Sequence, residues 1–268
     1  MHKTFQLLSK SPVSKFALMA SLSTFLLGCN MTPDTSNEKV GSNTTPSSNT
    51  AVNSQTATTN DQKTNTNSKC YNEYYPVKDG ATLEYKTSGT TNTNYTLKHS
   101  KINDEGFAEE RDFASGVVVN NNWVCTDEGL RTAEYTNNVS MEKAQMKMDT
   151  ISSSGITIPK EWSVGKEWDT DFKIKADLNA GPLSTVADGT VKVANKIVSV
   201  DEKITAGGKE YQASRVDSKI TISLTVKGAK APGLTVTTRN WYAKGIGLVK
   251  QEAGSSLGNQ SVEYVGTK

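Results

Sequence analysis

Two stretches of the sequence alternate strictly between apolar and polar residues, and this pattern most constrains the fold. In 168–178, apolar or small residues beginning with Trp168 and Phe172 take alternate positions, with charged residues between them. In 219–227, the apolar positions run from Ile220 to Val226 and include Leu224, with Lys, Thr and Ser between them. Period two with one polar face is typical of antiparallel strands that cover a core on one side and face water on the other.

Shorter runs of the same kind continue through the rest of the chain, with turn signals at 79–80, 188–189 and 207–208. The segment 141–148, MEKAQMKM, leaves helix and strand open, because it alternates nearly as well as a strand. We therefore expect a mainly β fold with little helix. The further expected strands are 81–87, 94–102, 117–125, 130–136, 190–200, 210–217, 234–242, 247–253 and 261–265.

Two segments of the chain resemble each other. Residues 123–135, WVCTDEGLRTAEY, and 241–253, WYAKGIGLVKQEA, each have a Trp, then Gly-Leu six and seven residues later, then a Glu eleven after the Trp. The sequence therefore predicts two diverged units, about 70–136 and 157–253, that form a curved antiparallel sheet or partly open barrel of two meander repeats. Trp123 and Trp241 either fill a β core or mark a ligand groove.

The N-terminus has the design of a secretory signal. Residues 1–28 contain three lysines and no acid, and the apolar run FALMASLSTFLL at 16–27 is too short to span a bilayer. Leu26-Leu27-Gly28-Cys29 resembles the lipobox of bacterial lipoproteins. That resemblance implies removal of residues 1–28, and acyl chains such as palmitate on Cys29 that anchor the chain in the membrane. Asn30 follows Cys29 at the position where inner-membrane lipoproteins often carry Asp. The absence of Asp there favours delivery to the outer membrane. It does not indicate whether the domain faces the periplasm or the cell surface.

Residues 29–69 are expected to form a lipidated, low-complexity linker ahead of a β-domain at 70–268. From 30 to 69, 24 of 40 residues are Ser, Thr or Asn, so the segment cannot bury enough apolar surface to fold. It is either a plain spacer or a glycosylated stalk. The chain has 30 basic and 28 acidic residues, and removal of 1–28 leaves 27 and 28. No basic footprint remains, so a nucleic-acid partner is not expected.

The cysteine count indicates a disulfide. With Cys29 lipidated, Cys70 and Cys125 remain as an even pair in an oxidising compartment. A bond between them would close a long loop where the linker meets the β-domain. A reactive or metal-binding pair is the alternative, but no CxxC spacing or nearby His supports it.

The second unit resembles a group of uncharacterised secreted bacterial β-domains and lipoproteins. The residues that carry this resemblance are IPKEWSVGKEW at 158–168, EKITAGGKEYQASRV at 202–216 and WYAKGIGLVKQE at 241–252. In the first unit, Val-Cys-Thr at 124–126 stands where the closing hairpin motif has Tyr-Ala-Lys. The family implies a strongly curved sheet like that of envelope carriers, and it brings no catalytic residues to carry over.

Residues for catalysis or cofactor binding are scarce. His99 is alone on a strand with a polar face and is expected to be a surface or satisfied residue, since no nucleophile motif accompanies it. Glu109 and Glu110 are adjacent, so on a strand they point to opposite faces, and such charges are expected to be solvated. We expect no enzyme, metal or cofactor.

Two main classes of function remain, beside a plainly structural role as a lipid-tethered spacer or coat protein. In the first, a membrane-anchored envelope lipoprotein presents a non-enzymatic β-domain to a protein or glycan partner. In the second, a periplasmic carrier or chaperone holds an acyl chain or another apolar ligand on the concave face of the sheet. The candidate residues of that face are Trp168, Phe172, Leu224, Val226 and Trp241. A carrier needs an unfilled apolar cavity, whereas a binding module fills that space with side chains.

Overall fold

The regular elements of the described chain are all β-strands. The computed structural model describes residues 68–90, 92–135, 139–141, 144–180, 183–230, 233–256 and 258–268. The expected signal peptide, Cys29 and nearly all of the expected linker lie outside the described residues. The strands are β1 (Thr82–Gly89), β2 (Tyr95–Ser100), β3 (Gly106–Phe113), β4 (Val118–Cys125), β5 (Gly129–Thr132), β6 (Val139–Met141), β7 (Ala144–Gly155), β8 (Ile158–Pro159), β9 (Glu167–Ala180), β10 (Leu183–Ala206), β11 (Lys209–Val226), β12 (Ala229–Lys230), β13 (Leu234–Ala243), β14 (Gly247–Ser255) and β15 (Gly258–Thr267).

These strands form one antiparallel sheet that contains two meanders. β1 to β5 are neighbours in chain order, and so are β9, β10, β11, β13 and β14. β15 pairs with both β14 and β1, and it joins the two meanders into one sheet. The path ends at β6 and β8, so the sheet is not closed into a ring. The predicted mainly β fold, a curved antiparallel sheet, is confirmed.

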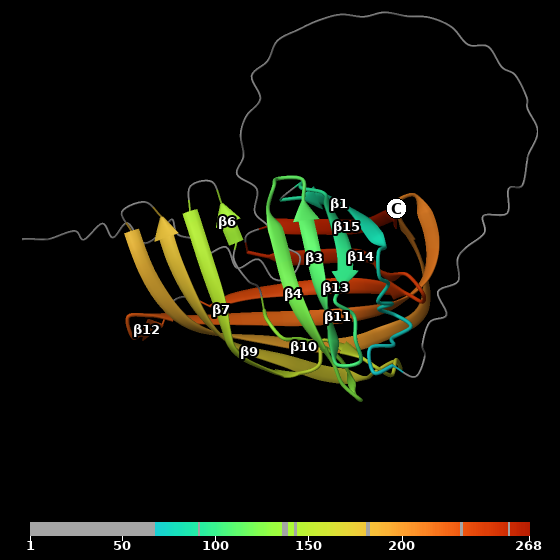
Figure 1. Cartoon of the computed structure of the whole chain (residues 1–268), viewed down its shortest axis with the longest axis horizontal. Helices are drawn as coiled ribbons and strands as arrows, with labels where there is room; N and C mark the ends of the chain where they lie inside the picture. Colours follow the sequence, from blue (N-terminus) through green and yellow to red (C-terminus); the bar gives the residue numbers. More distant parts are fainter. Residues whose placement is uncertain are drawn as a thin grey trace, which may run out of the picture.

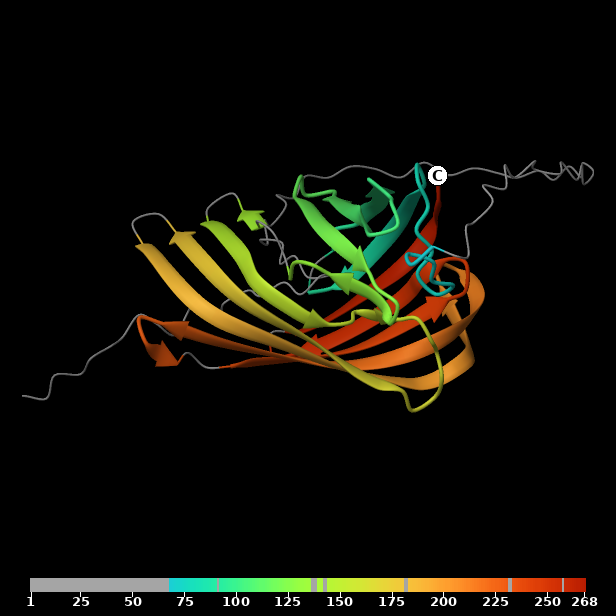
Figure 2. The same cartoon turned by 60° about the horizontal axis from the view of Figure 1, so that its bottom comes forward.

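The sheet curls until its two halves face each other. β9, β10 and β11 are long strands of 14, 24 and 18 residues, and they form a trough (Figure 1). β1 to β4 stand over the concave side of this trough (Figure 2). The curl therefore brings side chains from the two meanders together, although they lie far apart in the sequence.

The predicted turn at 207–208 is confirmed. Ala206 at the end of β10 pairs with Lys209 at the start of β11, which leaves Gly207 and Gly208 as a two-residue hairpin loop. Both glycines have positive φ, 54° and 77°, as the tight turn between two right-twisted strands requires.

The predicted turn at 188–189 is wrong, because β10 runs straight through it. Gly189 pairs with Leu224 on β11 and with Ile174 on β9, in the middle of the sheet. A Cβ atom at Gly189 would lie 2.6 Å from Leu224 Cδ2 and 3.0 Å from Ile174 Cγ1. The glycine is therefore needed for space in the core, and the expected strands 190–200 and 210–217 are parts of the longer β10 and β11.

Other expectations differ in detail. The ambiguous segment 141–148 contributes to the strands β6 and β7 and to no described helix. Of the expected strand 130–136, only residues 130–132 are in a strand, as part of β5 (Gly129–Thr132). β3 was not expected from the sequence, because its apolar residues share a face with two charged ones.

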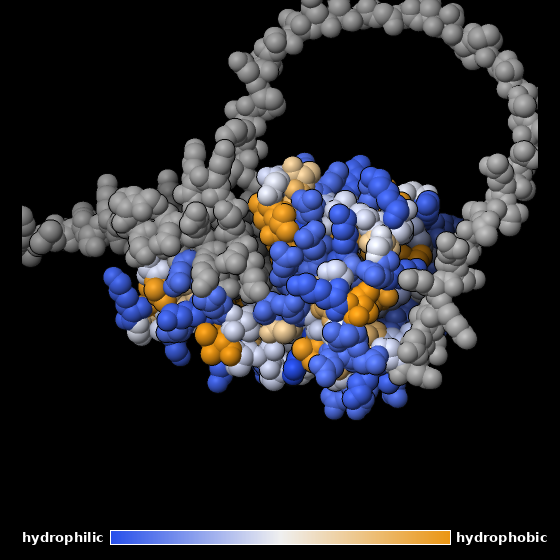
Figure 3. Space-filling view, in the orientation of Figure 1, coloured by the Kyte–Doolittle hydropathy of each residue, from blue (hydrophilic) through white to orange (hydrophobic). Residues whose placement is uncertain are grey.

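Two groups of buried apolar side chains hold the fold together. The larger one spans both meanders and includes Tyr85, Phe172 and Val191. The smaller one surrounds Cys70 and Cys125 and includes Phe107 and Trp123. The face of the molecule that Figure 3 shows is mostly hydrophilic, with small separate apolar patches. Within the described residues, no helix is long and apolar enough to cross a membrane.

Candidate functional site

A cavity of about 140 Å³ lies between the two meanders, and we call it the concave cavity. Its first wall comes from the first meander and its second wall from β9–β11, β13 and β14. Both walls mix aromatic and aliphatic side chains with polar ones. The lining residues used below are His99, Arg111, Asn121, Trp123 and Tyr135 on the first wall and Trp168 and Gln251 on the second.

A buried ion pair supports the first wall. Glu109 lies in the middle of β3 and is fully buried, and Arg111 follows two positions later on the same face. Arg111 Nε and Nη2 lie 2.8 Å and 2.7 Å from Glu109 Oε1. The Tyr75 hydroxyl donates a hydrogen bond to Glu109 Oε2, and the Asn121 amide donates one to Oε1 over 3.4 Å. Both carboxylate oxygens are therefore hydrogen-bonded.

The cluster contains one pair of opposite charges, the Glu109 carboxylate and the Arg111 guanidinium, which neutralise each other. Burial raises the pKa of Glu109, but the Arg111 guanidinium and the hydrogen bonds from Tyr75 and Asn121 outweigh burial and hold that pKa below its usual value. Burial lowers the pKa of Arg111, yet the Glu109 carboxylate raises it overall. Burial also raises the pKa of Tyr75, and it raises the pKa of Tyr95 to about 12. At neutral pH the carboxylate and guanidinium are thus charged and the two phenols are not.

His99 differs from its sequence expectation. It is 5% exposed, and neither ring nitrogen has a hydrogen-bond partner among the described residues. Its Nε2 lies 3.9 Å from Glu109 Oε2, which is too far for a hydrogen bond. Burial lowers the pKa of His99, so the ring is neutral at pH 7, with one N–H donor and one acceptor nitrogen.

A row of amide and hydroxyl side chains crosses the second wall. Ser218 on β11 donates to Asn195 on β10 over 2.7 Å. Asn240 on β13 donates to Ser218 over 3.4 Å, and Gln251 on β14 donates to Asn240. This row leaves Gln251 Oε1 without a partner in the described structure.

Several other buried polar atoms of the concave cavity are also unpartnered. Within the described part of the chain, no group hydrogen-bonds to Nη1 of Arg111, Oδ1 of Asn121, Nε1 of Trp123 or the Tyr135 hydroxyl. A buried polar group without a partner costs about 1–3 kcal/mol, and native proteins contain few of them. Their concentration in one cavity, with both donors and acceptors present, makes it the candidate binding site.

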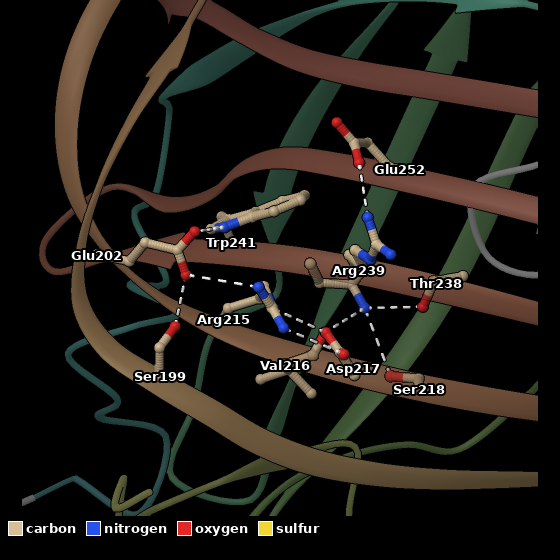
Figure 4. Close-up of polar contacts among 11 residues, drawn as sticks. Ser199, Glu202, Arg215, Val216, Asp217, Ser218, Thr238, Arg239, Trp241 and Glu252 are labelled. Carbon is tan, nitrogen blue, oxygen red and sulfur yellow. Dashed lines mark hydrogen bonds and ion pairs between the residues drawn. The ribbon is translucent and has the colours of Figure 1, made fainter.

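The five predicted residues of the apolar face do not act together. Trp168 and Phe172 line the concave cavity. Leu224 is buried in the larger apolar group, and Val226 packs partly buried against the same group; neither lines the cavity. Trp241 on β13 does not line it either, and its indole N–H donates to Glu202 on β10 over 3.2 Å (Figure 4). The two repeat tryptophans thus differ, because Trp123 lines the cavity and Trp241 does not.

The structure joins Cys70 and Cys125 in a disulfide, with 4.9 Å between their Cα atoms. This is the pairing that the cysteine count predicts. Asn72, two residues after Cys70, donates to the Pro159 carbonyl over 2.9 Å and accepts from the Tyr75 backbone N–H over 3.1 Å. The disulfide and Asn72 together hold the segment that carries Tyr75 toward Glu109.

Sequence reasoning missed the Glu109–Arg111 pair. Glu109 and Glu110 do point to opposite faces, with Glu110 exposed, but Glu109 is not solvated. The signal lies in β3, where Phe107 and Phe113 share a face with Glu109 and Arg111. Two aromatic residues at that spacing indicate that the charges between them are buried.

The fold and the site define a class: a strongly curved antiparallel sheet that encloses a cavity of mixed apolar and polar lining inside its curl. The chain belongs to the DUF3108-like family, which it matches over residues 64–261. No curated protein matches the sequence.

Two solved structures are similar in outline. One is a candidate exported protein with a YmcC-like fold from Bacteroides fragilis, 12% identical, with a TM-score of 0.45; the match covers 74% of this chain and 100% of that one. The other is a candidate lipoprotein from Parabacteroides distasonis, 14% identical, with a TM-score of 0.46; the match covers 74% of this chain and 99% of that one.

Proposed function

We propose that this protein is an exported, lipid-anchored protein of a bacterial envelope that binds a small ligand, or the end of a larger one, in the concave cavity. The observation that carries the proposal is the set of buried, unpartnered polar atoms on side chains that line this cavity. A bound molecule offering hydrogen bonds would recover the free energy that these atoms lose by burial.

Sequence features support the envelope location. The lipobox-like Leu26-Leu27-Gly28-Cys29 supports a lipid anchor, and the Cys70–Cys125 disulfide suits an oxidising compartment. We further propose that the protein is delivered to the outer membrane, because Asn30 directly follows Cys29.

The chemistry of the cluster supports binding without transformation of the ligand. Arg111 holds the pKa of Glu109 low, which makes this carboxylate a weak base. His99 is neutral, and no hydrogen bond to a described residue orients its ring for proton transfer. We therefore propose a binding protein and no enzyme.

The volumes favour a polar ligand over an acyl chain. Pockets for drug-sized ligands usually measure about 300–1,000 Å³, and the concave cavity is smaller, at about 140 Å³. A second, wider depression of about 1030 Å³ has charged and hydroxyl side chains such as Asp217, Arg239 and Glu252 in its lining, and no large apolar side chain. The wider depression thus lacks the apolar lining that a carrier of acyl chains needs. The concave cavity does have apolar side chains in its lining, such as Leu83, Phe172 and Ile220, but it is too small to enclose a long acyl chain.

Native mass spectrometry of the full-length lipoprotein, purified from the envelope in a mild detergent, tests the binding proposal. We expect a reproducible added mass that is lost when the protein is denatured. A bare-protein mass, with no added mass after incubation with an envelope extract, would overturn the proposal.

Membrane fractionation of a Cys29→Ala variant tests the anchor. The expected result is loss of acyl labelling and release from the membrane fraction. Unchanged retention of the variant in the membrane would show that the anchor lies elsewhere.

A further inference from the structure

We infer that the ligand of the concave cavity is an uncharged, hydroxyl-rich ring: a single neutral sugar residue, either free or at the end of a glycan. This inference rests on the proposed binding function and deepens it. Its evidence is the kind of polar atom left unpartnered, the charge state of the site, the available aromatic face and the size of the space.

The unpartnered atoms include both donors and acceptors. Arg111 Nη1 and Trp123 Nε1 are donors, Asn121 Oδ1 and Gln251 Oε1 are acceptors, and neutral His99 offers one of each. A hydroxyl group donates one hydrogen bond and accepts up to two, so several hydroxyls on one ring can satisfy such a mixed set. An acyl chain would leave every one of these atoms unpaired.

The charges disfavour ionic ligands. Glu109 and Arg111 already neutralise each other over 2.7 Å, so the cluster has no net charge to offer an anion or a cation. A carboxylate or phosphate would lie near the Glu109 carboxylate, and an ammonium group would meet the free N–H groups of Arg111 and Trp123. Either charge would be desolvated without an opposite partner.

Trp168 is a lining residue whose ring has no aromatic partner among the described residues. It is half-buried, and its N–H donates to the Thr157 carbonyl over 3.3 Å. By contrast, Trp123 is covered by Tyr75 and Phe107, with ring centroids 4.9 Å and 5.5 Å away. The negative face of an aromatic ring attracts the weakly positive C–H groups of a sugar ring. Trp168 thus offers a stacking face, and Trp123 offers its N–H edge.

The space matches one ring. An apolar cavity of about 150 Å³ accommodates benzene, so about 140 Å³ encloses at most the ring of one sugar residue, and some of its hydroxyl groups would lie at the mouth of the cavity. A longer glycan would therefore place only its terminal residue in the cavity.

Titration calorimetry and saturation-transfer NMR on the full-length protein test the inference. The probes are glucose, galactose, mannose and N-acetylglucosamine, each also as the end of an oligosaccharide, with glucuronate and palmitate as the charged and the acyl controls. We expect at least one neutral sugar to bind, with transfer concentrated on the C–H groups of one ring face, and glucuronate to bind at least tenfold more weakly. Tighter binding of the oligosaccharide than of the free sugar would identify the ligand as a glycan end. Equal affinity for the two would identify it as a free sugar. Both results support the inference.

Two matched pairs of variants test the residues. Trp123→Phe keeps the ring and removes the unpartnered N–H, so it should weaken sugar binding about five- to tenfold, the usual effect of one hydrogen bond. Trp241→Phe removes an N–H that is bonded to Glu202 outside the cavity and should change nothing. Asn121→Leu should weaken binding at least tenfold. Asn120→Leu, at the exposed neighbouring position of β4, should not.

The outcomes separate this inference from the binding proposal. Binding of palmitate or glucuronate with no binding of any neutral sugar would overturn the sugar inference and leave the binding proposal in place. Sugar binding that is equally insensitive to Trp123→Phe and Asn121→Leu would place the sugar elsewhere and overturn the inference as well. No binding of any probe, together with a bare mass from the envelope, would overturn both.

Discussion

The hydroxyl of Tyr75 donates a hydrogen bond to the carboxylate of Glu109, 34 residues away in the sequence. Tyr75 belongs to the segment held by the Cys70–Cys125 disulfide, and Glu109 belongs to β3. This contact links the anchored start of the domain to the charged cluster of the concave cavity. The structure of the cavity therefore depends on two segments that are far apart in the sequence, the disulfide-bonded segment with Tyr75 and the strand β3 with Glu109.

Loss of the Glu109 charge should strongly destabilise the fold. Glu109→Gln leaves the buried Arg111 guanidinium without an opposite charge, and we expect a loss of about 3 kcal/mol in the free energy of unfolding, measured by urea denaturation. The neighbouring Glu110→Gln is the control, because Glu110 is exposed, and it should change stability by less than about 0.5 kcal/mol. The double variant Glu109→Gln/Arg111→Met should recover most of the loss, and no recovery would contradict the ion-pair account.

His99 should make stability depend on pH below neutrality. Its pKa is lowered from 6.5 in the folded state, so as pH falls through 6.5 the unfolded chain binds the proton first. The free energy of unfolding should then fall between pH 7 and pH 5, with a limiting slope of about 1.4 kcal/mol per pH unit. His99→Gln should flatten the profile in this window. An equally steep profile in the variant would assign the effect to another group.

Glu109 should act in a separate, more acidic window. Its pKa is lowered from 4.5, so its contribution to stability is present above 4.5 and is lost as pH falls through the lower folded-state value. In the double variant Glu109→Gln/Arg111→Met, the stability decrease below pH 4.5 should be smaller than in the wild type. Urea denaturation between pH 5 and pH 2.5 measures the difference, and parallel profiles would contradict it.

The disulfide should contribute substantially to stability. It joins residues 55 apart, and in the chain-entropy model closure of such a loop contributes about 4 kcal/mol. The double variant Cys70→Ser/Cys125→Ser should lower the free energy of unfolding by this order. Reductant should lower the stability of the wild type and leave that of the variant unchanged. A wild type that is insensitive to full reduction would show that the bond has little energetic effect.

Gly189→Ala should destabilise the trough of long strands. The new Cβ would lie 2.6 Å from Leu224 Cδ2, and overpacking of this kind costs about 1–3 kcal/mol. Gly266→Ala on β15 is the matched control, because a Cβ there has no atom within 4 Å. Thermal unfolding of the two variants compares them. Equal transition temperatures would mean that the core around Leu224 relaxes freely.

Much of the fold follows from local patterns. The alternation in 168–178 and 219–227 predicts β9 and part of β11, because side chains of a strand alternate between faces regardless of its partners. The positive φ angles of the Gly207-Gly208 turn are equally local. At Gly207 the tertiary structure adds a second reason for glycine, because a Cβ there would clash with the Tyr264 carbonyl oxygen. The repeated Trp and Gly-Leu motif likewise coincides with two hairpins, β4–β5 and β13–β14.

The concave cavity could not be predicted from such local patterns. Whether Glu109 is solvated or buried depends on Tyr75 and Asn121, which reach it from other segments. Gly189 has the appearance of a turn residue in the sequence, and only the side chains of Leu224 and Ile174 show that it is needed for space.

The sequence by itself determined the β class, most strands of the two meanders and the cysteine pair, because these depend on residue spacing and on the number of cysteines. The tertiary structure decided which face of each strand is enclosed and which tryptophan lines the cavity. It also decided which polar atoms are left without a partner. These properties depend on how far the sheet curls, and curvature arises from packing between strands that are distant in the sequence.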